Sequence, residues 1–157
     1  MGQRGLGNEN KQEHIMKLNR FQQIILGISG VTACAIGTLI ALAPHAFYAS
    51  YGITLGQDPN LLNELRAPGA GLAVFGALML AGMFRAAMVP ISLGVALTVY
   101  LAFPAGRIVG IVLDGMPAGS VIGALGFEIL IAGLLLVAFR PMRKVDASAE
   151  RFVDLSR

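Results

Sequence analysis

The sequence predicts an all-α fold, a four-helix transmembrane bundle, from its composition and from the spacing of its apolar stretches. Of its 157 residues, 55% are hydrophobic and 13% are charged, and the mean hydropathy is +0.70. Soluble domains carry roughly 25% charged residues, so a water-exposed surface here would be largely uncharged. In a bilayer a low charged fraction is favoured, because a charge at the centre of a spanning helix costs about 2.5–3.5 kcal/mol. Four apolar stretches of spanning length then predict an integral membrane protein.

The charges are concentrated at the two ends of the chain. Apart from Arg66, Arg85 and Arg107, every Lys and Arg lies in the terminal segments, where the positive-inside rule places cytoplasmic charge. The pattern predicts a polar cytoplasmic tail, a transmembrane domain and a basic cytoplasmic tail over residues 1–20, 21–139 and 140–157.

The first predicted helix, Ile24–Ala43, is uncharged over the roughly 20 residues that cross a hydrocarbon core of about 30 Å. A cleaved signal peptide is the alternative, since Ala41-Leu42-Ala43 resembles a cleavage site. The apolar part is longer than the usual stretch of about 7–15 residues, and Pro44 follows directly. A membrane span is therefore favoured.

The segment Pro44–Asn60 is expected to be an outside loop whose aromatic residues lie at the membrane–water interface. His45 within it is expected to be an interfacial hydrogen-bonder, because no Cys or acidic partner stands at metal-ligand spacing. Asp58-Pro59 is a helix start signal, with an N-cap aspartate before a first-turn proline.

Three further helices follow from the remaining apolar stretches and the residues that end them. Arg85 ends the second helix on the inside, and Asp114 to Pro117 forms an outside turn. The second helix is expected to begin near Pro59, and its strictly apolar part is Ala67–Phe84. The third helix covers Ala86–Gly106 and is expected to continue to Leu113. The fourth helix runs from about Ala118 to Phe139.

Small residues recur at four-residue spacing in each helix, a pattern that allows close helix packing in lipid. We expect these stripes to be the packed faces, including Ala77 on the second helix, and to carry Asp114 and Glu128 on those faces. The stripes comprise Ser29, Ala33, Gly37, Ala41; Gly69, Ala73, Ala77, Ala81; Ala102, Gly106, Gly110; and Ser120, Ala124, Ala132.

Five charges within the apolar segments are predicted to form one charged cluster near the outer side, and they are the candidate site residues: Glu64, Arg66, Arg107, Asp114 and Glu128. Three roles stay open, namely an ion-paired structural knot, a ligand or ion site, and a docking site for a partner. Pro68 and Pro104 each remove a helical hydrogen bond, which favours a hydrated or ligand-holding pocket. Arg107 and Glu128 are expected to pair.

The sequence lacks the residue patterns that are typical of several classes of function. No basic patch is interleaved with aromatics, so nucleic-acid binding is not expected. Zinc-ligand pairs, phosphate loops and nucleophile elbows are missing, and Cys34 is expected to serve packing. The leading expectation is a binding or accessory module in the lipid bilayer, self-associating or part of a larger membrane complex. The alternative is an enzyme or carrier that uses Glu64, Asp114 or Glu128 on a small quinone-like or lipid-like molecule; no cofactor is indicated.

The residues Asn63 to Gly69, Gly106-Arg107 with Gly110, Asp114 to Pro117, and Glu128 resemble a bacterial family of small four-helix membrane proteins. That family is known as a domain of unknown function, and the resemblance spans about residues 21–139. It implies a bacterial-type inner (plasma) membrane protein and supplies no activity. The architecture also loosely resembles DoxX-like proteins, some of which are accessory to quinone-linked oxidoreductases.

Overall fold

The computed structural model describes residues 18–139 as a set of helices, and no strand occurs within that range. The elements are α1 (Arg20–Leu42), α2 (Pro44–Ala49), α3 (Pro59–Phe84), the 3-10 helix η1 (Ala86–Met88), α4 (Val89–Asp114) and α5 (Gly119–Ala138). Four helices are long and apolar enough to cross a membrane: α1, α3, η1 continued by α4, and α5. The all-α prediction is confirmed. The predicted cytoplasmic tails lie outside the described residues, apart from the few next to α1.

Local capping chemistry sets the helix starts. The Asp58 side chain accepts a hydrogen bond from the Asn60 amide at 3.0 Å, which confirms the predicted N-cap of α3. Asn19 and Gln22 form a reciprocal capping box at the start of α1, with bonds of 2.8 and 2.9 Å. Gly115 ends α4 with a φ of +94°, a conformation that L side chains rarely adopt. These signals place the helix ends within a few residues of the predicted bounds.

The loop expected over Pro44–Asn60 differs from the structure, because its first part is the short helix α2. Pro44 occupies the first helical position, where a missing amide hydrogen carries no cost. Gly52 follows with a φ of +77° and turns the chain back. His45 Nε2 lies 3.2 Å from the Gly56 carbonyl, so this histidine makes a hydrogen bond across the connection, as expected.

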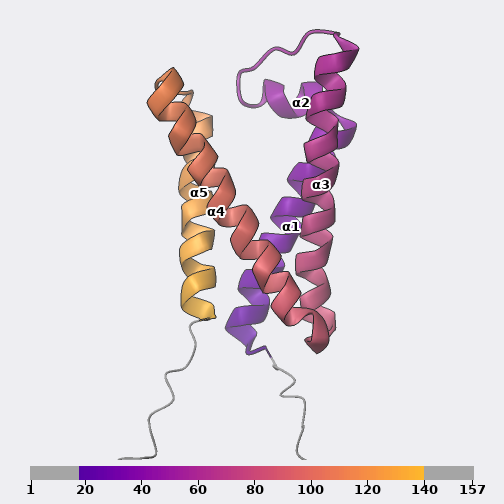
Figure 1. The fold of residues 1–157 in the computed structure, drawn as a ribbon, viewed down its shortest axis with the longest axis vertical. Helices are drawn as coiled ribbons and strands as arrows, with labels where there is room; N and C mark the ends of the chain where they lie inside the picture. Colours follow the sequence, from indigo (N-terminus) through magenta and orange to yellow (C-terminus); the bar gives the residue numbers. More distant parts are fainter. Residues whose placement is uncertain (1–17, 140–157) are drawn as a thin grey trace, which may run out of the picture.

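The four long helices are arranged as two pairs (Figure 1). α1 and α3 lie side by side, while α4 runs diagonally away from the end of α3 to pack along α5. The Gln22 side chain donates to the Ala138 carbonyl at 2.8 Å, which joins the start of α1 to the end of α5. The end of the molecule where α1 begins and α5 ends is called the terminal end. The opposite end, which holds α2 and the turn between α4 and α5, is called the α2 end. The pairs meet toward the terminal end and diverge toward the α2 end.

The contact between α1 and α3 depends on glycine at specific positions. A Cβ at Gly76 would collide with the backbone of Cys34, and one at Gly37 with the backbone of Ala73. A Cβ built on Gly69 would likewise lie only 2.7 Å from Cγ2 of Ile40. Backbones this close are typical of small-residue helix pairs in lipid.

The predicted packing face of α3 needs a correction. Gly69 and Gly76 are buried, but Ala77 is exposed. The buried side follows alternating spacings of three and four residues through Gly69, Leu72, Gly76 and Met79. A strict four-residue stripe drifts around a helix of 3.6 residues per turn, and by Ala77 it has left the interface.

Polar side chains tie α4 to the first helix pair. The Tyr100 hydroxyl donates to the Ser29 carbonyl at 2.9 Å, and the Ser92 hydroxyl donates to the Leu78 carbonyl at 2.6 Å. Both residues are buried beside a core that includes Leu26 and Met79. In an apolar environment these bonds fix the position of α4 against α3 and α1.

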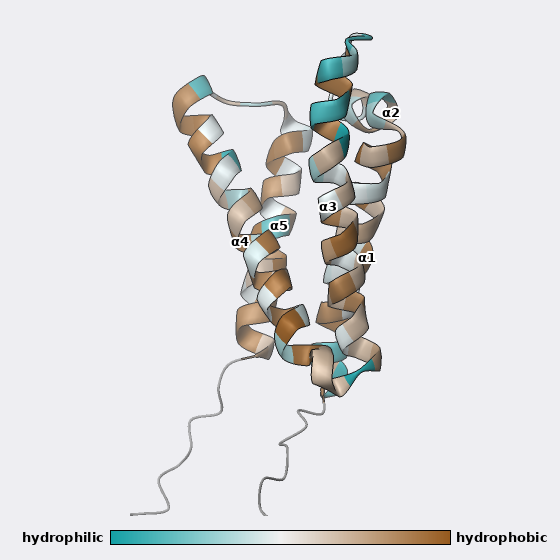
Figure 2. Ribbon diagram, turned by 45° about the vertical axis from the view of Figure 1, so that its right-hand side comes forward, coloured by the Kyte–Doolittle hydropathy of each residue, from teal (hydrophilic) through white to brown (hydrophobic). Residues whose placement is uncertain are grey.

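Hydrophobic residues predominate along the four long helices (Figure 2), and many of the large ones are exposed. Hydrophobic residues run along the helix lengths, and hydrophilic ones gather toward their ends. Large exposed side chains such as Val112, Leu113 and Leu130 are costly in water but suit the hydrocarbon region of a bilayer. The surface therefore agrees with the membrane prediction from composition.

Candidate functional site

A cavity of about 760 Å³ lies where the two helix pairs diverge. Its walls come from the second half of α1, α2 and the residues after it, one residue of α3, and the facing parts of α4 and α5. Most of this lining is apolar. The volume falls within the range of about 300–1,000 Å³ that small-molecule sites occupy.

Small residues on α4 and α5 leave this space open, which corrects their predicted role as helix contacts. Ala102 and Gly106 of α4 line the cavity, as do Ser120 and Ala124 of α5. Around Gly106 no atom lies within 4 Å of where a Cβ would stand. The prediction that these four residues pack against a neighbouring helix is therefore wrong, whereas Ala132, farther along the α5 stripe, is buried in the core as predicted.

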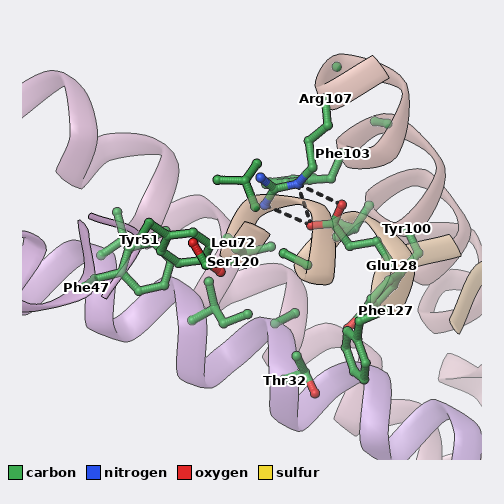
Figure 3. Close-up of a pocket in the computed structure, with 18 of the residues that line it drawn as sticks. Thr32, Phe47, Tyr51, Leu72, Tyr100, Phe103, Arg107, Ser120, Phe127 and Glu128 are labelled. Carbon is green, nitrogen blue, oxygen red and sulfur yellow. Dashed lines mark hydrogen bonds and ion pairs between the residues drawn. The ribbon is translucent and has the colours of Figure 1, made fainter. Parts of the chain in front are cut away.

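One ion pair stands in the cavity wall (Figure 3). Arg107 Nε lies 3.0 Å from Glu128 Oε2 and 3.2 Å from Oε1, and Nη2 lies 3.1 Å from Oε1. The Arg107 side chain is 27% exposed and that of Glu128 13%. The pairing predicted between these residues is therefore present, with both carboxylate oxygens engaged.

Arg66, a third member of the predicted charged cluster, has a different role. Its Nη1 donates to the carbonyl of Ala41, and to that of Leu42 at 3.4 Å. These carbonyls belong to the last turn of α1, where backbone acceptors lack helical partners and the helix dipole is negative. Arg66 thus caps α1 from α3.

The two remaining members lie on the surface. Glu64 and Asp114 are both exposed, and neither is among the residues that line the cavity. Asp114 is the last residue of α4, so the small-residue stripe does not place it on a packed face. Of the five predicted site residues, the structure brings together only Arg107 and Glu128.

The structure adds site residues that the charge pattern could not find. Thr32 and Tyr100 line the deeper part of the cavity, and Phe47 and Tyr51 line its α2 end (Figure 3). The rings of Phe47 and Tyr51 pack 5.2 Å apart between centroids. A tyrosine in the middle of an apolar span was a usable signal for Tyr100, because its hydroxyl needs a partner in lipid.

No group of three or more potential ligands capable of holding a metal ion occurs among residues 18–139. Four membrane-length helices around an apolar cavity, with one ion pair in its wall, define a small α-helical membrane protein. The chain belongs to the family described as a domain of unknown function (DUF4345), whose model matches residues 21–139. The expected membership of an uncharacterised family is thereby confirmed. Searches of curated proteins and of solved structures gave no match.

Proposed function

We propose that this protein is a binding module of a bacterial-type inner membrane, which holds a small lipophilic molecule in the cavity between its two helix pairs. Both termini are assigned to the cytoplasm, so the cavity opens toward the non-cytoplasmic side. The excess of Lys and Arg in the terminal segments supports this orientation. Arg85 agrees with it, because it follows α3 at the terminal end.

The cavity of about 760 Å³ is the observation that carries the proposal. Small residues on α4 and α5 leave this space open, and larger apolar side chains of the same helices, such as Phe103 and Phe127, complete its wall. An apolar cavity within the bilayer is accessible to molecules dissolved in lipid. Its single ion pair provides charged groups at one defined point, and hydroxyl side chains such as Thr32, Tyr51 and Ser120 add a few further polar groups, as ligand sites commonly have.

Binding is better supported than the enzyme alternative. An acid–base reaction needs a titratable group directed at the substrate. Among the residues that line the cavity, Glu128 is the one carboxylate, and both of its oxygens accept hydrogen bonds from Arg107. Glu64 and Asp114, the other acids considered for this role, are exposed outside the cavity. The accessory role and self-association stay predictions, for which the exposed apolar faces of α4 and α5 offer surface.

Native mass spectrometry of the protein extracted with its surrounding lipid tests the proposal. We expect a small molecule to remain bound, and a bulky side chain placed in the cavity to displace it. Ala102→Phe is the test variant, because Ala102 lines the cavity on α4. Ala105→Phe is the matched control, because Ala105 is exposed on the same helix outside the lining.

The proposal predicts retained ligand in the wild type and in Ala105→Phe, and its loss in Ala102→Phe. Equal retention in all three proteins would place any bound molecule on the outer lipid-facing surface. A stable partner protein with no retained small molecule would favour the accessory role.

A further inference from the structure

The Arg107 guanidinium has hydrogen-bond donors left over after pairing with Glu128. A guanidinium carries five N–H groups, and only Nε and Nη2 donate to the carboxylate. Nη1 donates to no residue in the described part of the chain. In Figure 3 one terminal nitrogen of Arg107 carries no dashed line and points away from Glu128. A ligand in the cavity therefore meets an unused donor.

The net charge of the wall decides what kind of acceptor fits that donor. Arg107 and Glu128 are the only charged residues in the lining, and their charges cancel. An anionic ligand would place a second negative charge near Glu128 with no further cation to balance it. Buried charge without a partner is costly, whereas a neutral acceptor needs only the hydrogen bond.

The position of the pair shows where the acceptor lies on the ligand. Arg107 precedes the end of α4 at Asp114 by seven residues, or roughly 10 Å of helix rise. Apolar lining continues on both sides of it, with Val99 deeper along α4 and Phe47 toward the α2 end. The acceptor is therefore flanked by apolar parts of the molecule, as an internal ester or ketone would be and a terminal headgroup would not.

We infer that the cavity selects an uncharged lipophilic molecule with an internal carbonyl, held by an N–H of Arg107, while Glu128 excludes anions by neutralising that arginine. This inference rests on the proposed function and specifies the ligand class of the same site. Glu128 then acts as the residue that sets charge selectivity.

The test uses three photoactivatable, clickable probes of equal chain length: an ester whose carbonyl lies in mid-chain, a chain that ends in a free carboxylate, and a hydrocarbon without an acceptor. Each is added to the protein in lipid nanodiscs at alkaline pH, which keeps the carboxylate ionised. Mass spectrometry of peptides then quantifies labelling of cavity residues, with Ala102→Phe giving the background. We expect the ester to label wild-type protein about tenfold more than the carboxylate or the hydrocarbon does.

Variants of the pair separate charge from cavity shape. Glu128→Gln removes the balancing charge and should reverse the preference, so that the carboxylate exceeds the ester. The double variant Arg107→Met/Glu128→Met keeps a neutral wall with no side-chain donor at either position, so the ester should lose its advantage over the other two probes. It also serves as the folded comparison if Glu128→Gln does not fold.

The outcomes distinguish this inference from the proposed function. Preference for the carboxylate in wild type, or an unchanged ester preference in the double variant, would overturn the selectivity inference and leave the binding proposal standing. Labelling of cavity residues no greater than in Ala102→Phe for all three probes would overturn both. Ester preference in wild type that disappears in the double variant supports the inference.

Discussion

The hydroxyl of Tyr100 donates to the backbone carbonyl of Ser29 at 2.9 Å, across the junction between the two helix pairs. Ser29 is fully buried, and its own hydroxyl donates to the backbone carbonyl of Ile25 within α1 at 2.7 Å. Tyr100 also lines the cavity. One side chain thus joins α4 to α1 and forms part of the wall, so the stability of the junction and the shape of the cavity are linked.

Tyr100→Phe should lower stability by about 0.5–1.5 kcal/mol, because it removes one interhelical hydrogen bond while keeping the ring. Thermal unfolding in detergent measures the change. Tyr48→Phe is the control, since the Tyr48 hydroxyl makes no hydrogen bond with the described part of the chain. Equal effects of the two changes would mean that the Tyr100 bond contributes nothing to the junction.

The ion pair predicts a thermodynamic cycle. Arg107→Gln and Glu128→Gln should each cost about 2–4 kcal/mol, since each strands a charge; the partial exposure of Arg107 keeps the cost below that of a fully buried pair. The double change should restore much of this loss. Unfolding free energies of the four proteins give the coupling, and strictly additive effects would show that the two residues do not interact.

The close contact of α1 and α3 predicts opposite effects for two glycines of α3. Gly76→Ala should destabilise by about 1–3 kcal/mol, because its Cβ would press on the Cys34 backbone. Gly71→Ala should be neutral or stabilising by up to about 1 kcal/mol, since its surroundings are open and alanine favours helix. Thermal unfolding that ranks the two changes the other way would contradict the described packing.

The capping role of Arg66 separates it from the ion pair. Arg66→Gln should lower the unfolding temperature, because the last carbonyls of α1 lose a charged donor. Glu64→Gln, two residues away on an exposed site, should leave that temperature unchanged. If both changes shifted stability together, or if Arg66→Gln altered the coupling between Arg107 and Glu128, the five charges would form one unit after all.

The proposed topology predicts which side of the membrane each connection faces. In a Cys34→Ala background, a cysteine at Gln57 should react with a membrane-impermeant thiol reagent added to the outside of spheroplasts. A cysteine at Ala87 should react only after the membrane is opened. Both positions are exposed, so burial does not confound the comparison. Labelling of both from the same side would refute the assignment of the termini to the cytoplasm.

Composition and local sequence patterns were sufficient to predict the class of protein and most of the helix ends. The scarcity of charges and the length of the apolar stretches are local properties of the sequence. Four membrane-length helices could therefore be predicted without tertiary information. Asp58-Pro59 likewise placed the start of α3, because an N-cap bond joins residues two positions apart. The pairing of Arg107 with Glu128 was also accessible, since both lie on consecutive helices joined by a short turn.

Which helices pack closely and which leave space between them depends on the three-dimensional arrangement and could not be predicted from local patterns. Small residues permit either outcome, and the choice depends on what stands opposite: Gly76 meets the α1 backbone, whereas Gly106 faces the cavity. The positions of the Glu64 and Arg66 side chains also depend on the tertiary structure. Glu64 and Arg66 are two residues apart on one helix, but a helix turns about 100° per residue, so their side chains leave in widely different directions. Arg66 reaches the end of α1 while Glu64 stays exposed, because the rotation of α3 against α1 is set by the glycine contacts between them.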